Sequence, residues 1–178
     1  MHFTLSRIGT IDIIVACFIL LTFYLMYLVL KRLKHGIDRC TVLLMILNGC
    51  AAGAAMATKW TGVYAGAGIA LMFFLFLMRE YIPAHGKRDI LTLFGICVAA
   101  YLCIPAVIYV LSYLSYPMQP GEHLLKKMWD NQVLMLTYHE STVFDHPYSS
   151  EWYEWTWMKR PLLDAYTTLP DGKISVVA

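Results

Sequence analysis

Four long runs without charged residues alternate along the chain with short, charged connections. A more polar tail of residues 117–178 follows the runs, which cover about residues 11–30, 40–58, 60–78 and 90–116. About 20 apolar residues in a helix are enough to span the hydrocarbon core of a bilayer. The pattern therefore predicts an all-α membrane protein, a polytopic helical bundle with about four transmembrane helices and an outer loop containing short amphipathic helices.

The second and third runs are separated by little more than Lys59. A tight helical hairpin and a pair of half-buried helices with an interruption both fit this spacing, and we favour the hairpin. Both runs are rich in small residues, with Gly49 and Gly53 four positions apart and Gly62 and Gly66 likewise. Because small residues at this spacing let helix backbones approach closely in lipid, we expect tight packing here.

The composition agrees with a membrane protein and excludes other classes. Apolar residues make up 59% of the chain and charged residues 15%, with a mean hydropathy of +0.57, unlike a disordered chain or an ordinary soluble domain. The net charge of +2 is too small and too scattered to indicate nucleic-acid binding. The cysteines lie within or at the edges of the runs, as packing residues do, rather than in a disulfide framework or a metal cluster.

The basic residues of the connections predict the orientation in the membrane. The second connection has Lys59 alone, whereas the first and third together hold Lys31, Arg32, Lys34, Arg39, Arg79, Lys87 and Arg88. Lys and Arg favour cytoplasmic connections. The start of the chain, the Lys59 hairpin and the tail are therefore expected together on the outer, extracytoplasmic face.

The beginning of the chain bears on its completeness. No basic cluster follows Met1 and no small-residue cleavage site precedes Lys31, which argues against a removable signal peptide. An N-terminus on the outer face requires a segment that inserts into the membrane and carries it across. We therefore expect earlier spans upstream and an internal fragment of a larger protein; a self-inserting first span is the alternative.

Two ionisable residues stand at the predicted outer ends of the spans. Asp12 begins the first span, and Lys59 lies between the second and third. Such groups are costly at membrane depth unless they face water, a partner or a ligand. A structural explanation is as good as a functional one for each residue. The positive end of the helix dipole would favour the Asp12 carboxylate, and the long Lys59 side chain would reach the membrane interface.

The tail combines an amphipathic segment with an aromatic, acidic one. Residues 122–136 place a stripe of Leu and Trp on one helical face, which suits a helix in the headgroup layer or one packed on the bundle. If the part after Pro147 is helical, Tyr148, Trp152 and Trp155 share a face, as an interfacial belt or as a platform for a sugar ring. The histidines of the tail lack a specific zinc spacing, so no metal site is predicted.

Three motifs in order resemble a known family. They are Ser6-Arg7-Ile8-Gly9-Thr10-Ile11-Asp12 entering a span, Thr58-Lys59-Trp60-Thr61-Gly62-Val63-Tyr64-Ala65 at the hairpin, and His146-Pro147-Tyr148-Ser149-Ser150 followed by Trp152, Trp155 and Arg160-Pro161. In order and spacing the chain is similar to the bacterial branch of the protein O-mannosyltransferases. The charge argument independently places all three motifs outside.

The resemblance implies a GT-C-like glycosyltransferase of a bacterial plasma membrane. It implies transfer of mannose from a polyprenyl- or dolichyl-phosphate donor to Ser or Thr hydroxyls of translocated proteins, with no firm cofactor, although a divalent cation is compatible. On this interpretation Arg7 and Lys59 bind the lipid phosphate, and Asp12 orients a cation or hydroxyl and is the one catalytic candidate. The sugar or acceptor side would be formed by His146, Tyr148, Ser149, Trp152, Trp155 and Arg160.

The chain also departs from the family pattern. The family's catalytic acidic pair is expected upstream of residue 1, and the tail is expected to be truncated at its C-terminal end, so the fragment alone is expected to be inactive. Thr156 follows Trp155 where many members have proline. The alternatives are a related lipid-linked-sugar transferase with another sugar or acceptor, and a non-catalytic membrane scaffold or transporter segment.

Overall fold

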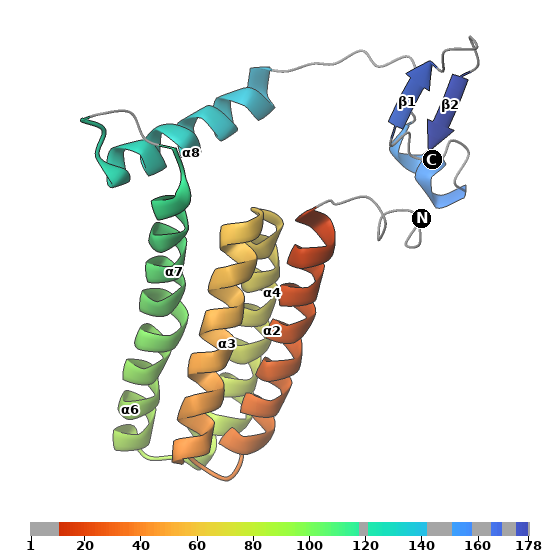
Figure 1. The fold of residues 1–178 in the computed structure, drawn as a ribbon. Helices are drawn as coiled ribbons and strands as arrows, with labels where there is room; N and C mark the ends of the chain where they lie inside the picture. Colours follow the sequence, from red (N-terminus) through yellow and green to blue (C-terminus); the bar gives the residue numbers. More distant parts are fainter. Residues whose placement is uncertain (1–10, 118–120, 142–150, 158–164, 169–173, 178) are drawn as a thin grey trace. The chain divides into compact units, whose positions relative to one another are not determined.

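The computed structural model describes residues 11–117, 121–141, 151–157, 165–168 and 174–177 (Figure 1). The chain divides into two compact units. One unit is Thr10–Asp130, which contains the helical bundle, and the other combines Met1–Gly9 with Asn131–Ala178. Each unit is described by itself below.

Four helical segments in the bundle unit are long and apolar enough to cross a membrane. The first two are single helices, α2 (Ile11–Leu33) and α3 (Arg39–Thr58). The third joins α4 (Thr61–Phe76), η1 (Leu77–Tyr81) and α5 (Ile82–Ala84), and the fourth joins α6 (Lys87–Val98), η2 (Ala99–Cys103), α7 (Ile104–Ser112) and η3 (Tyr113–Ser115). The predicted polytopic bundle with four spans is confirmed.

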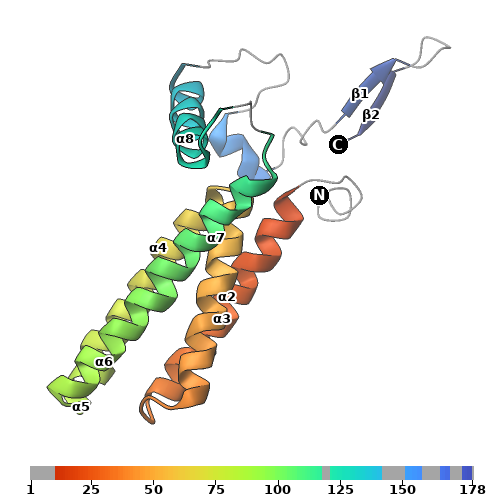
Figure 2. The ribbon, with the colours of Figure 1, turned by 60° about the vertical axis from the view of Figure 1, so that its left-hand side comes forward.

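Both composite spans contain one π-helical turn next to a proline. η1 leads directly into α5, which contains Pro83, and η2 leads into α7, which contains Pro105. Proline has no N–H to donate to the preceding turn, and a widened π turn accommodates the missing bond. The helix axis therefore continues through each proline, as Figures 1 and 2 show for α6 and α7.

Helix α3 is the centre of the bundle, lying between α2 and α7 in both views (Figure 2). Its glycines make this packing possible. A Cβ added to Gly49 would lie 1.9 Å from the carbonyl oxygen of Ala100 in η2, and one added to Gly53 would lie 2.9 Å from the Cα of Pro105. The small residues therefore allow close backbone approach, as the sequence pattern predicts.

A buried polar contact joins α2 and α3 near the middle of these two candidate spans. Asn48 is fully buried in α3 and faces Thr22 of α2. In the amide orientation that satisfies both ends, Asn48 donates to the Thr22 carbonyl (3.3 Å) and accepts from the Met26 N–H (3.1 Å). Because lipid offers no competing hydrogen bonds, such a contact fixes the register of the two helices.

The chain after the bundle forms smaller elements. Helix α8 (Leu124–Ser141) covers the predicted amphipathic segment, and η4 (Trp152–Trp157) is a 3₁₀ helix. The strands β1 (Ala165–Thr168) and β2 (Ile174–Val177) pair antiparallel, with Ala165 opposite Val177. This strand pair is an addition to the helical architecture that the sequence analysis does not anticipate.

Candidate functional site

The structure joins two of the predicted site residues directly. The Lys59 ammonium donates to Asp12 Oδ1 at 2.5 Å, although the two residues are 47 positions apart in the chain. Both side chains remain about half exposed, 41% for Lys59 and 51% for Asp12. We call the end of the bundle that holds this pair the Lys59 end, and the opposite end, with loop 34–38, the Arg32 end.

A tight turn between α3 and α4 positions Lys59. The last residue of α3, Thr58, donates its hydroxyl to the Ala54 carbonyl, and the Lys59 N–H donates to the Ala55 carbonyl. Lys59 itself is extended, with φ −160° and ψ 145°, so the helix ends there. Its carbonyl accepts from the Gly62 N–H at 2.9 Å, which begins α4. The connection is thus the hairpin that the sequence analysis favours.

The hairpin requires glycine at position 62 because any side chain there would collide with α3. A Cβ at Gly62 would lie 2.5 Å from the carbonyl carbon of Ala55, a backbone atom that cannot move aside. The close approach of α4 to α3 therefore depends on glycine at this position. It also holds Lys59 within reach of the first turn of α2, where Asp12 lies.

The ion pair by itself contributes little to folding stability. Exposed ion pairs contribute about 0–1 kcal/mol to folding, because water solvates the separated charges nearly as well. Asp12 in the first turn of α2 also benefits from the positive end of the helix dipole. An ammonium group has three N–H donors, so Lys59 can hold Asp12 and an anion such as a phosphate together.

A tyrosine ladder lies at the same end of the bundle. The rings of Tyr109 and Tyr113 are 5.7 Å apart and those of Tyr113 and Tyr116 are 5.9 Å apart. The Lys127 ammonium lies 5.9 Å from the Tyr116 ring centroid and 3.4 Å from a Glu122 oxygen. The sequence analysis missed this ladder, although tyrosines three and four positions apart at the end of the fourth span are typical of an interfacial aromatic belt.

Most of the remaining predicted site residues cannot be placed. Arg7, His146, Tyr148, Ser149 and Arg160 lie outside the described residues. Trp152 and Trp155 belong to η4, of which the backbone is described. Since η4 is a 3₁₀ helix, the α-helical spacing used to align the aromatic residues of the tail does not apply to it.

The absence of a metal site stays a prediction. In the part of the chain that the structure describes, no group of three or more His, Cys, Asp or Glu residues lies close enough to hold an ion.

Comparison with known proteins places these observations in a family. Residues 1–115 match the family model described as dolichyl-phosphate-mannose-protein mannosyltransferase. The chain belongs to this family. The matched region contains Arg7, Asp12 and Lys59 and all four spans, and it ends before the aromatic tail. No curated protein and no solved structure matches the chain.

Family membership establishes the class of activity. The dolichyl-phosphate-mannose-protein mannosyltransferases are glycosyltransferases of the protein O-mannosylation kind, which take mannose from a dolichyl-phosphate-mannose donor to a protein acceptor. The four spans agree with an integral membrane protein. The resemblance drawn from the first two motifs is therefore confirmed at the level of the family.

Proposed function

We propose that the full-length protein transfers mannose from a polyprenyl- or dolichyl-phosphate carrier to Ser or Thr hydroxyls of translocated proteins, as the bacterial branch of the family does. The Lys59 end of the bundle is the active end and faces the extracytoplasmic side. The observation that carries the proposal is the ion pair between Lys59 and Asp12, which lies in the matched region and brings two distant motifs together.

The reaction explains why a cation is needed at this place. The acceptor oxygen forms a bond to the anomeric carbon of mannose while the bond from that carbon to the phosphate oxygen breaks. The hydroxyl proton passes to a carboxylate base, and the phosphate leaves on the lipid with an additional negative charge. A fixed cation beside that oxygen stabilises the charge as it develops.

Lys59 is suited to this role by its position at the end of the spans. A lipid phosphate lies at the membrane interface, and Lys59 is expected at the same depth because the hairpin of α3 and α4 joins the ends of two candidate spans. Arg7 is the second proposed phosphate ligand, from the segment that precedes α2. Asp12 holds the Lys59 ammonium toward α2 and orients it, or a hydroxyl, at the same site.

The basic residues support the proposed orientation. The two connections at the Arg32 end carry seven basic and three acidic side chains, within residues 31–40 and 78–90. An excess of Lys and Arg in short connections favours the cytoplasmic side. The Lys59 end and the aromatic tail then lie outside, where translocated acceptor proteins are found.

The tail is proposed to lie on the same, extracytoplasmic side of the membrane as the active end. Along α8 the apolar stripe is exposed, with Leu125 63%, Trp129 67% and Leu136 55% accessible. An apolar stripe of this kind suits a helix that lies in the headgroup layer, and we propose this arrangement for α8. His146, Tyr148, Ser149, Trp152, Trp155 and Arg160 remain the proposed sugar or acceptor side.

The proposal is tested by the variant Lys59→Ala in the full-length enzyme. Loss of a cation that stabilises the leaving phosphate should lower kcat/KM for the lipid-linked mannose donor on the order of 100-fold. Lys34→Ala is the matched control, because Lys34 forms an exposed ion pair with Glu80 (2.7 Å) at the Arg32 end. Unchanged turnover and donor affinity in Lys59→Ala would exclude the phosphate role.

A further inference from the structure

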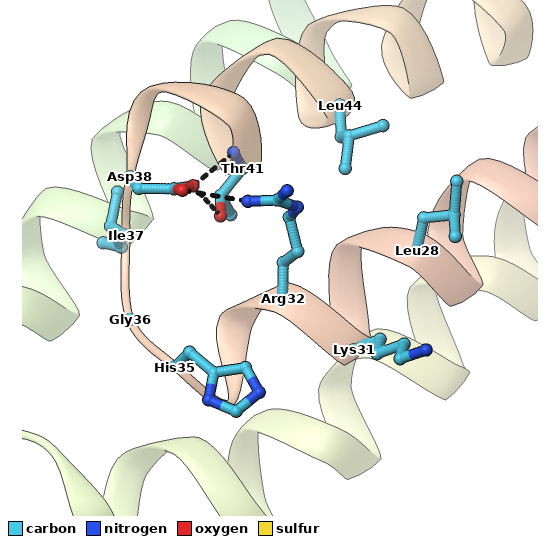
Figure 3. Close-up of a pocket in the computed structure, with 9 residues that line it drawn as sticks. All are labelled: Leu28, Lys31, Arg32, His35, Gly36, Ile37, Asp38, Thr41 and Leu44. Atoms are coloured by element: carbon cyan, nitrogen blue, oxygen red, sulfur yellow. Dashed lines mark hydrogen bonds and ion pairs between the residues drawn. The ribbon is translucent and has the colours of Figure 1, made fainter.

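A second polar site lies at the Arg32 end, opposite the proposed active end. A hollow of about 620 Å³ opens between the end of α2, loop 34–38 and the start of α3 (Figure 3). Three basic side chains line it, those of Lys31, Arg32 and His35, together with a single carboxylate, Asp38. We call it the basic hollow.

The loop that forms the basic hollow is fixed by Asp38. Its Oδ1 accepts from the backbone N–H of Thr41 (2.7 Å) and from the Thr41 hydroxyl (2.6 Å), which caps α3. Those two hydrogen bonds, helped by nearby Arg32, lower the pKa of the Asp38 carboxyl from its ordinary value of 3.8. Gly36, with φ +101°, turns the chain between α2 and α3 at a conformation that other residues rarely adopt.

Asp38 in turn orients Arg32. One guanidinium nitrogen of Arg32 donates to Asp38 Oδ2 at 2.9 Å, and Figure 3 shows the side chain extending across the hollow to reach it. A guanidinium has five N–H donors in a rigid fork, and this contact uses a single nitrogen. Arg32 is therefore held in place with donors left for an anion.

Lys31, the second cation of the hollow, has no acidic partner within the described residues. Lys34, just outside it, is paired with Glu80, whereas Lys31 forms no ion pair there. The His35 ring lies at the foot of the loop, and Lys31 extends along α2 on the side away from Asp38 (Figure 3). Two cations, Lys31 and Arg32, against one carboxylate leave the hollow complementary to an anion, and the His35 ring lies beside them.

Two apolar side chains decide which kind of anion fits. Leu28 of α2 and Leu44 of α3 form the wall of the hollow toward the middle of the spans, and both are half-buried. A soluble anion gains nothing from that wall, whereas the glycerol and first acyl carbons of a lipid would cover it. The basic rim at the end of the spans lies at the depth of lipid headgroups.

We propose that the basic hollow binds the phosphate headgroup of an anionic phospholipid from the leaflet at the Arg32 end. Arg32 and His35 donate to the phosphate oxygens, Lys31 turns toward the headgroup from the side, and the acyl carbons contact Leu28 and Leu44. The site is separate from the proposed active end and does not depend on the mannosyltransferase reaction.

The test uses the full-length protein in phosphatidylcholine nanodiscs containing spin-labelled phosphatidylglycerol. Lys31→Gln, which breaks no ion pair of the described residues, should weaken the immobilised lipid signal on the order of fivefold, and Lys31→Arg should retain it. Lys87→Gln is the matched control, since it removes the same charge from the same end of the bundle outside the hollow. It should change the signal less than about twofold.

Two results would overturn the proposal. An equal loss in Lys87→Gln and Lys31→Gln would mean that the basic surface attracts lipid without a defined site. Displacement of the labelled lipid from the unmodified protein, but not from Lys31→Gln, by added inorganic phosphate would mean that the hollow takes a soluble phosphate. Retention of the lipid in the presence of phosphate, with the selective loss in Lys31→Gln, supports the lipid headgroup.

Discussion

The two ends of the bundle hold ion pairs of similar geometry in different surroundings. At the Lys59 end one ammonium meets one carboxylate, contributed by segments 47 residues apart. At the Arg32 end, Arg32 meets Asp38 only six residues away, across a short loop with the further cations Lys31, Lys34 and Arg39 in and beside it. A pair within one loop follows from the turn itself, whereas the distant pair exists only because α2, α3 and α4 pack together.

This difference separates two uses of charge in a membrane protein. The excess of basic residues at the Arg32 end agrees with a cytoplasmic face and an attraction to anionic lipid. The balanced pair at the Lys59 end contributes little to folding stability and adds no net charge that would set the orientation of the protein in the membrane, which fits the proposed role of Lys59 in binding a ligand. Contact distance alone would not distinguish the two ends.

The largest predicted effect is the loss of activity when the two charges of the Lys59 pair are exchanged, compared with the same exchange in an ion pair at the Arg32 end. The double variant Asp12→Lys with Lys59→Asp retains an ion pair but moves the cation away from the hairpin, so mannosyl transfer should stay reduced on the order of 100-fold. The exchange Lys34→Glu with Glu80→Lys retains the other pair and should leave transfer within about twofold of the unmodified enzyme. The measurement is mannosyl transfer by the full-length enzyme from a lipid-linked donor.

Recovery of activity by the exchanged Lys59 pair would contradict the phosphate role. It would show that the Lys59 end, like the Arg32 end, needs only an ion pair to hold its segments together.

An intermediate effect is predicted for Asp12→Asn. The amide can still accept a hydrogen bond from Lys59 but no longer carries charge, so the ammonium should be less well oriented and turnover should fall about tenfold. The measurement is kcat and KM for the donor, with Glu80→Gln at the Arg32 end as the matched control. An equal loss in the control would remove the distinction between the two ends.

The smallest effect is predicted for Thr41→Val at the Arg32 end. The variant removes the hydroxyl that donates to Asp38 and should lower the melting temperature by about 2–4 °C at pH 7, without changing mannosyl transfer. Because the Asp38 pKa is lowered in the folded protein, its stabilising contribution is complete above the ordinary value of 3.8 and is lost as the pH falls through the lower folded value.

The melting temperatures of the unmodified protein and the Thr41→Val variant should therefore converge in strong acid. A difference that persists below the folded pKa of Asp38 would show that Thr41 acts through packing instead.

The four spans could be predicted because helices that face lipid need apolar side chains, and this leaves long uncharged runs in the sequence. The helix ends could not, since charged residues such as Lys31 and Arg32 continue α2 to Leu33, where their long side chains can reach water. The proline positions gave no sign of η1 and η2 as π turns, because a proline kink was equally compatible with them.

The sequence alone could suggest the pairing of Asp12 with Lys59 but could not establish it. Both residues were predicted at one face of the membrane, yet their contact depends on the close packing of α4 on α3 at Gly62. The strand pair was foreseeable, since Thr167, Thr168 and the Ile174–Val177 segment are rich in β-branched residues, separated by the turn-forming sequence Pro170-Asp171-Gly172.

The most direct test asks which end of the bundle receives the donor headgroup. A photoreactive benzoylphenylalanine replaces Trp60 beside Lys59, or Cys40 at the Arg32 end, in the full-length enzyme. The probe is a short-chain prenyl-phosphate mannose, labelled in the sugar, whose tail is too short to cross the membrane. Crosslinking at position 60, lost in Lys59→Ala and absent at position 40, is the predicted result. Crosslinking at position 40 in preference to position 60 would contradict the assignment of the Lys59 end as the active end.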